Sequence, residues 1–141
     1  MKRNGMKAVL MAVLPLALIL LCGCSPFSRT LDESIYDREE MAELAKQVIL
    51  YMAEDNYQPI LDMVNDTVTD SITEDVLINA NEKMRLKGGY FVQFGNVNVT
   101  GDRGDEEALC KVTVVAQHNK RSFTYTIVFN TEKKIVSLYL I

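Results

Sequence analysis

Thiols are the side chains with the most intrinsic chemistry in this sequence, which contains three cysteines: Cys22, Cys24 and Cys110. A thiolate is a nucleophile that can be alkylated, oxidised or bound to a metal. Cys22 and Cys24 close an apolar run, whereas Cys110 stands in an alternating, strand-like pattern. A lone cysteine in such a strand is more often a small buried hydrophobe than a nucleophile. We therefore expect the cysteine chemistry of this chain to lie around residue 24.

The segment before Cys24 has the composition of a secretory signal. Residues 1–7 carry three cations and no acid, and residues 8–21 are apolar throughout. This run is shorter than the roughly 20 residues of a membrane-spanning helix, which favours a cleavable signal over a transmembrane anchor. The sequence predicts that residues 1–23 form a signal peptide.

The end of this segment, Leu21, Cys22, Gly23 and Cys24, resembles the bacterial lipobox. The resemblance implies that signal peptidase II recognises Leu21, Cys22 and Gly23, and that Cys24 becomes the lipidated first residue of the mature chain. It further implies a lipoprotein that carries palmitate and is anchored in the membrane on the extracytoplasmic face. The alternatives are ordinary signal cleavage nearby and an uncleaved anchor.

Charge and length restrict the partners of the mature chain. Removal of residues 1–23 leaves 118 residues, which is enough for one domain. It also lowers the number of basic residues from 15 to 12, while the 19 acidic residues remain. The mature chain therefore has a formal net charge of −7. An anionic membrane surface repels such a domain, so the lipid would have to hold it there. No basic stripe with interleaved aromatics is present, which argues against a nucleic-acid partner.

Hydrophobic periodicity predicts helices first and strands afterwards. We expect a tether over residues 24–36 and one domain over residues 37–141. Helices are predicted at 37–53, 57–65 and from a Ser71–Glu74 capping box to the glycine pair 88–89, with strands at 90–99, 108–117, 122–129 and 134–140. Three helices followed by an antiparallel meander indicate an α+β fold.

Three stretches make the chain resemble the DUF3887 family of secreted and lipid-anchored proteins: residues 53–64, residues 86–95 and residues 135–140. More widely, the element order resembles the NTF2-like, cystatin-like cone. That resemblance implies three N-terminal helices packed on a curved four-stranded antiparallel sheet, with a ligand pocket at the open end of the cone in many members. Some members of that superfamily, such as the ketosteroid isomerases, are enzymes.

An isomerase-like site needs a carboxylate base and a tyrosine donor in one apolar cavity. No spacing identifies such a pair, and the tyrosines are more simply amphipathic residues at the core margin, namely Tyr51, Tyr57, Tyr90, Tyr125 and Tyr139. His118 is expected to be an exposed loop residue. The acids at 102–107 lack the register of a calcium loop. A polar rim at 65–71 and a hinge at Gly88 and Gly89 could border a cavity, although an ordinary helix connection is the simpler interpretation.

These observations predict a membrane-anchored extracytoplasmic lipoprotein that acts without catalysis. Its partner would be a small apolar ligand, a peptide or an envelope protein, and no cofactor, metal ligand or catalytic residue is assigned. One alternative is a small enzyme with a Tyr/carboxylate pocket. Another is a self-associating structural module, with a homodimer as its expected form.

Overall fold

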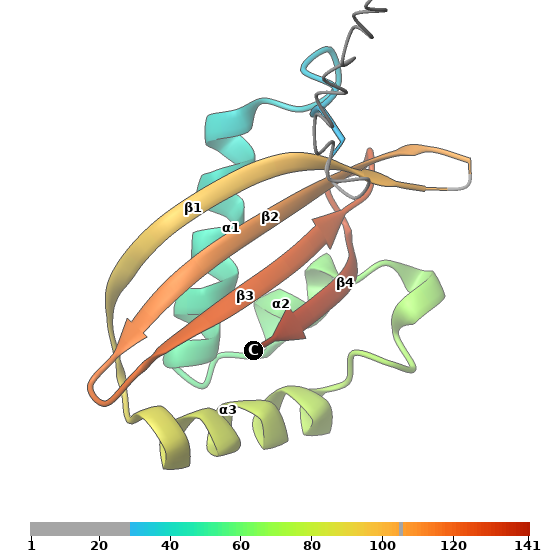
Figure 1. Ribbon diagram of the computed structural model, residues 1–141. Coiled ribbons are helices and arrows are strands. Elements are labelled where there is room, and N and C mark those ends of the chain that lie inside the picture. Colours follow the sequence, from blue (N-terminus) through green and yellow to red (C-terminus); the bar gives the residue numbers. More distant parts are fainter. Residues whose placement is uncertain (1–28, 105) are drawn as a thin grey trace, which may run out of the picture.

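The computed structural model describes residues 29–104 and 106–141, which form a helical layer on a single sheet. Figure 1 shows the elements in chain order. The helices are α1 (Arg38–Ala53), α2 (Gln58–Met63), the 3-10 turn η1 (Asp66–Val68) and α3 (Glu74–Gly88), and the strands are β1 (Phe91–Arg103), β2 (Ala108–His118), β3 (Ser122–Phe129) and β4 (Ile135–Leu140). The strands are antiparallel in the order β1-β2-β3-β4, which confirms the predicted α+β class and the predicted order of elements.

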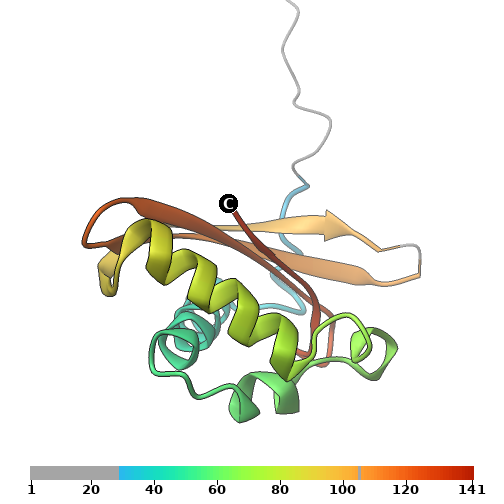
Figure 2. The same ribbon diagram turned by 90° about the horizontal axis from the view of Figure 1, so that it is seen from below.

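The three helices cover one face of the sheet, as Figure 2 shows. Helix α1 starts where the Asp37 carboxylate accepts a hydrogen bond from the Glu40 amide, 2.8 Å away. Its apolar stripe recurs at three- and four-residue intervals and is fully buried, comprising Met41, Ala45, Val48, Ile49 and Met52. This stripe packs on β1 and β2, so α1 forms the centre of the core.

Helix α3 begins two residues later than the predicted capping box would place it. Thr73, rather than Ser71, caps the helix, because the Thr73 hydroxyl accepts from the Val76 amide at 3.3 Å. At the other end Gly89 has φ +76°, a left-handed conformation that glycine adopts without steric cost. Gly88 is buried in the last turn, where it serves helix packing in an ordinary helix connection, the interpretation that the sequence favoured.

Strand β1 ends four residues later than predicted. Gly101, assigned to a loop by its turn-like neighbours, pairs with Cys110 of β2. On its other side the Gly101 amide donates to the Arg29 carbonyl oxygen at 2.8 Å, and a Cβ at Gly101 would lie 2.5 Å from the Thr30 carbonyl oxygen. A side chain would therefore prevent this close approach, which explains a glycine in mid-strand.

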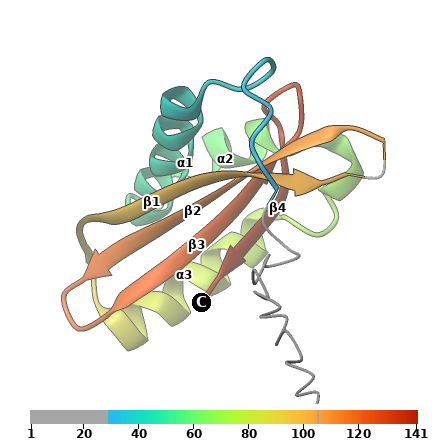
Figure 3. The ribbon, with the colours of Figure 1, turned by 45° about the horizontal axis from the view of Figure 1, so that its top comes forward.

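Residues 29–36, part of the predicted tether, lie against the end of β1 (Figure 3). Leu31 and Tyr36 are buried there, and the Tyr36 hydroxyl donates to the Ala108 carbonyl oxygen at 2.7 Å. Burial raises the pKa of Tyr36 to about 12, so the hydroxyl keeps its proton and its role as a donor. This segment closes the edge of the core at the far end of β1.

Candidate functional site

The predicted lipidation motif, Leu21, Cys22, Gly23 and Cys24, lies outside the described residues. Within the part of the chain that the structure describes, no helix is both long and apolar enough to cross a bilayer. The third cysteine, Cys110, is fully buried in β2. Burial raises the pKa of its thiol to about 11, so Cys110 stays a neutral core residue with little reactivity.

His118 is not the exposed loop residue that the sequence suggests. It is the last residue of β2 and half-buried, with Nδ1 2.9 Å from the Gly89 carbonyl oxygen. Its ring meets the rings of Phe123 and Phe91 edge-on, with centroids 5.0 and 6.0 Å away. The Nε2 atom is buried without a hydrogen-bond partner. The imidazole therefore packs as an aromatic ring between the end of α3 and the β2–β3 hairpin.

The tyrosines also differ in part from the predicted margin positions. Tyr90 and Tyr139 are mostly exposed, whereas Tyr125 is fully buried and its hydroxyl lies 3.1 Å from the Met84 sulfur. Tyr57 is buried as well, and its hydroxyl donates to the Asp55 carboxylate at 2.8 Å. Asp55 and Tyr57 form the carboxylate and tyrosine pair that an isomerase-like site would require.

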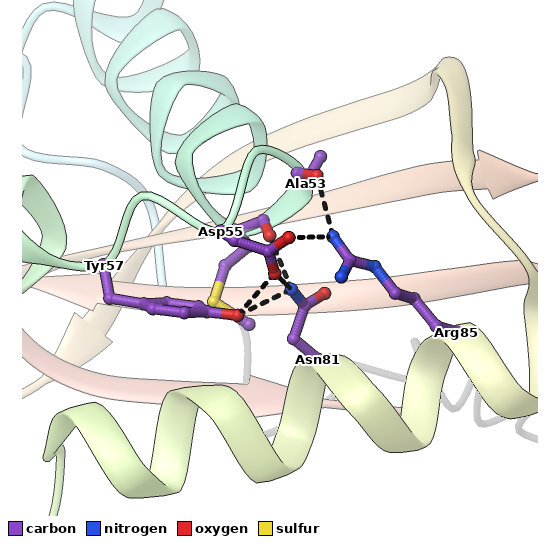
Figure 4. Close-up of polar contacts among 6 residues, drawn as sticks. Ala53, Asp55, Tyr57, Asn81 and Arg85 are labelled. Atoms are coloured by element: carbon purple, nitrogen blue, oxygen red, sulfur yellow. Dashed lines mark hydrogen bonds and ion pairs between the residues drawn. The ribbon is translucent and has the colours of Figure 1, made fainter.

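This pair belongs to a network that fastens α1 to α3 (Figure 4). Asn81 donates through Nδ2 to the Met52 carbonyl oxygen at 2.7 Å, to Asp55 at 2.9 Å and to the Tyr57 hydroxyl at 2.9 Å. Arg85 donates to the Ala53 carbonyl oxygen at 3.1 Å and to Asp55 at 2.8 Å. The two side chains thus supply hydrogen bonds to two carbonyl groups at the C-terminal end of α1, those of Met52 and Ala53.

Asp55 occupies a left-handed position, φ 58°, directly after the α1 cap. The Asp55 amide donates to the Met52 carbonyl oxygen, and the Asn56 amide donates to the Tyr51 carbonyl oxygen. This pair of hydrogen bonds is the Schellman motif, which commonly ends a helix. The hydrogen bond from Arg85 holds the pKa of Asp55 below its usual value. A lowered pKa makes Asp55 a weak base, and its side chain is half exposed to solvent. The geometry therefore suits a structural junction better than proton transfer.

A groove of about 530 Å³ runs between α3 and the end of the sheet formed by β3 and β4. This volume lies within the range of about 300–1,000 Å³ typical of small-molecule sites. Apolar residues form most of its lining, namely Val76, Ala80, Met84, Phe123, Leu140 and Ile141. Val76 and Ile141 are 48% and 81% exposed, which leaves apolar surface open to solvent at the mouth. The groove is the described cavity best suited to a ligand.

Three cations stand along this groove: Lys83 and Lys87 from α3, and Arg121 from the β2–β3 hairpin. The Arg121 guanidinium lies over the Phe123 ring, 4.9 Å from its centroid. None of the ion pairs between residues that the structure describes includes any of these three side chains. The groove thus combines an apolar floor with a positive rim in a chain whose net charge is negative.

Sequence reasoning missed both the network and the groove. Asn81 gave a usable signal, because a polar residue at a buried position between Leu77 and Met84 implies a buried hydrogen bond. Lys83 and Lys87 were visible as a pair one helical turn apart. Arg121 is 34 residues further on, and only the packing of the hairpin on α3 brings it to them. No His, Cys, Asp or Glu cluster able to hold a metal occurs among the described residues.

Comparisons with known proteins agree with this fold. The family profile of DUF3887, a protein family of unknown function, matches residues 45–138, which contain the Asp55 network and most of the groove. The NMR structure of a protein from Ruminococcus gnavus is 20% identical, with a TM-score of 0.69 over 80% of this chain and 97% of that chain. This likeness shows a shared fold. No curated protein matches the chain.

Proposed function

The chain belongs to the DUF3887 family of proteins of unknown function, and from this premise we propose that it is a non-catalytic ligand-binding protein of the bacterial envelope. The observation that carries the proposal is the groove between α3 and β4, which is large enough for a small molecule and has exposed apolar residues at its mouth. Exposed apolar surface beside a cavity is typical of binding sites.

The same proposal places the protein in the NTF2-like superfamily. A four-stranded antiparallel sheet with three helices on one face supports it, as does the long α1 helix lying across β1 and β2. In that superfamily the open end of the cone is often a ligand pocket. The α3–β4 groove has α3 as one of its walls, so it lies on the helical side of the sheet.

Occupancy of the groove can be measured with methionine methyl groups as NMR probes. We expect ligands from a mixed library of small neutral and charged compounds to shift the signal of Met84, which lines the groove, in the full chain reconstituted in phosphatidylcholine nanodiscs. Met41, a buried residue of α1 outside the groove lining, is the internal control, and its signal should not move. A library in which no compound shifts Met84 would contradict a binding function for the groove.

A variant separates binding in the groove from binding elsewhere. Ala80→Phe places a ring in the lining and should remove the Met84 shift, whereas Glu82→Phe adds the same ring at an exposed position outside the groove and should preserve the shift. Equal responses from the two variants would place the ligand at another surface.

Lipidation of Cys24 is the second element of the proposed function, and the lipobox-like sequence before it is its support. We expect Cys24→Ser to leave unprocessed precursor and to abolish palmitate incorporation, because the thioether needs a thiol. Mass spectrometry of the membrane fraction and labelling with palmitate measure both effects. Cys22→Ser is the matched control and should still be processed; unchanged labelling of Cys24→Ser would rule out the anchor.

A further inference from the structure

We propose that the α3–β4 groove binds a free anionic amphiphile, a single apolar chain with a carboxylate or phosphate head. This inference rests on the proposed binding function and names the chemical class of its ligand. The head would lie among Lys83, Lys87 and Arg121, and the chain would lie along the apolar floor towards Val76 and Leu140.

The positions of the cations have only a partial structural explanation. Basic residues in the last turn of a helix offset the negative end of its dipole, which accounts for Lys87 and for Arg85, the partner of Asp55. Lys83 is a full turn earlier, and Arg121 is on another element. Lys83 and Lys87 are also spaced so that like charges repel each other in the free protein. An anion between them would convert this repulsion into attraction.

Arg121 is held where it can meet such an anion. Its guanidinium lies over the Phe123 ring in the floor of the groove. The hairpin that carries it is fixed to α3, because the Lys120 amide donates to the Gly88 carbonyl oxygen at 2.9 Å. Arginine binds carboxylate and phosphate oxygens through two parallel hydrogen bonds, so a positioned guanidinium favours these heads.

The apolar floor continues inward from the cations. A small, partly open void of about 80 Å³ adjoins the groove and shares Val76, Ala80 and Leu140 with its lining. The void is otherwise lined almost entirely by apolar side chains, namely Met52, Ile72, Leu77, Tyr125 and Leu138, with Ser71 as the exception. An apolar passage that begins at a positive rim and ends in a void lined mostly by apolar side chains matches a ligand with a charged head and an apolar tail.

A dissolved molecule fits this site better than a bilayer surface. The positive rim is small and concave, and the chain as a whole is acidic, so a flat anionic membrane would meet mostly like charge. The positive rim also lies at the end of the sheet where Phe91 pairs with His118. Arg29, the first described residue after the predicted lipidation site, lies at the other end, beside Gly101. These ends are ten residues of β1 apart, at most about 33 Å at 3.3 Å per residue.

Titration of the full chain in phosphatidylcholine nanodiscs tests the inference, with the methyl signal of Met84 as the reporter. Decanoate and decyl phosphate should shift Met84, and 1-decanol should bind at least about tenfold more weakly because it has no charge. Each added methylene in the chain should tighten binding by up to about fourfold while it remains buried. Equal affinity for 1-decanol would overturn the anionic class and leave the binding function standing.

Charge variants provide the matched comparison. Lys83→Gln with Lys87→Gln removes two exposed cations from the rim and should weaken decanoate binding about tenfold. Lys120→Gln removes an exposed cation on the same hairpin outside the groove and should leave binding unchanged. Equal losses in both would overturn the site. A Met84 shift caused by nanodiscs containing phosphatidylglycerol, without added amphiphile, would assign the rim to a membrane surface and overturn the free ligand.

Discussion

Gly88→Ala is expected to destabilise the protein by about 2–3 kcal/mol, although alanine is normally the better helix former. A Cβ at Gly88 would lie 2.8 Å from Cζ of Phe123 and closer still to Cε2, well inside van der Waals contact. The Phe123 ring is buried and rests against His118, so it has little room to move. Urea unfolding followed by circular dichroism measures the loss, since the chain contains no tryptophan.

A double-mutant cycle identifies the cause of this loss. In a Phe123→Leu background the opposing ring is absent, so the added methyl group should cost at least about 1 kcal/mol less than in the wild type. Equal costs in both backgrounds would show that the contact between α3 and β3 does not set the requirement for glycine. The same contact seats α3 beside the groove, so Gly88→Ala should also alter the Met84 methyl signal.

Asn81→Ala should cost about 2–3 kcal/mol of stability, because it removes the buried hydrogen bonds of the Asn81 amide group to Met52, Asp55 and Tyr57 and opens a cavity. Asn79→Ala, on the same helix but exposed, is the matched control and should change stability by less than about 0.5 kcal/mol. Equal effects at both positions would mean that the network of Figure 4 contributes little to the contact between α1 and α3.

The pH response of this network has a defined sign. The pKa of Asp55 is lower in the folded protein than its ordinary value. The stability that the ionised carboxylate contributes is therefore present at a pH above the ordinary pKa and is lost as the pH falls through the lower pKa of the folded state. The effect is modest, because the Asp55 side chain is half exposed and solvent screens it. In Asn81→Ala the ion pair between Asp55 and Arg85 should still form, so most of the loss of folding stability at low pH should remain.

Local patterns were sufficient to predict most of the elements. The apolar stripe of α1 and the alternation of β2 each determine which face is buried, so their types and approximate bounds follow from sequence. The end of β1 did not follow, because Gly101 reads as a turn residue unless its pairing with Arg29 and Cys110 is known. The N-cap of α3 was predicted at the wrong residue, because Ser71 and Thr73 both have side chains that cap helices well. Only the backbone conformation of the folded chain determines that Thr73 takes this role.

The groove and the network could not be predicted in the same way, because both depend on contacts between distant parts of the chain. Asp55 and Arg85 are separated by 30 residues, and Lys83 and Arg121 by 38. Hydrophobic periodicity places Lys83 on the more polar side of α3 but does not tell which strand end lies beside it. The orientation of α3 on the sheet supplies that information, and it is set by the packing of Gly88 on Phe123.

The pairing of Arg29 with Gly101 has a consequence for a protein anchored through Cys24. Only residues 25–28 then separate the lipid from the folded part, and five Cα steps reach at most about 18 Å whatever their conformation. If Cys24 carries the proposed lipid, this short tether would confine the search for partners to a thin layer above the bilayer, where diffusion is two-dimensional and the local concentration of neighbouring anchored proteins is high. A longer segment between Cys24 and Arg29, rather than a change in the groove, would increase the distance from the bilayer at which the protein meets its partners.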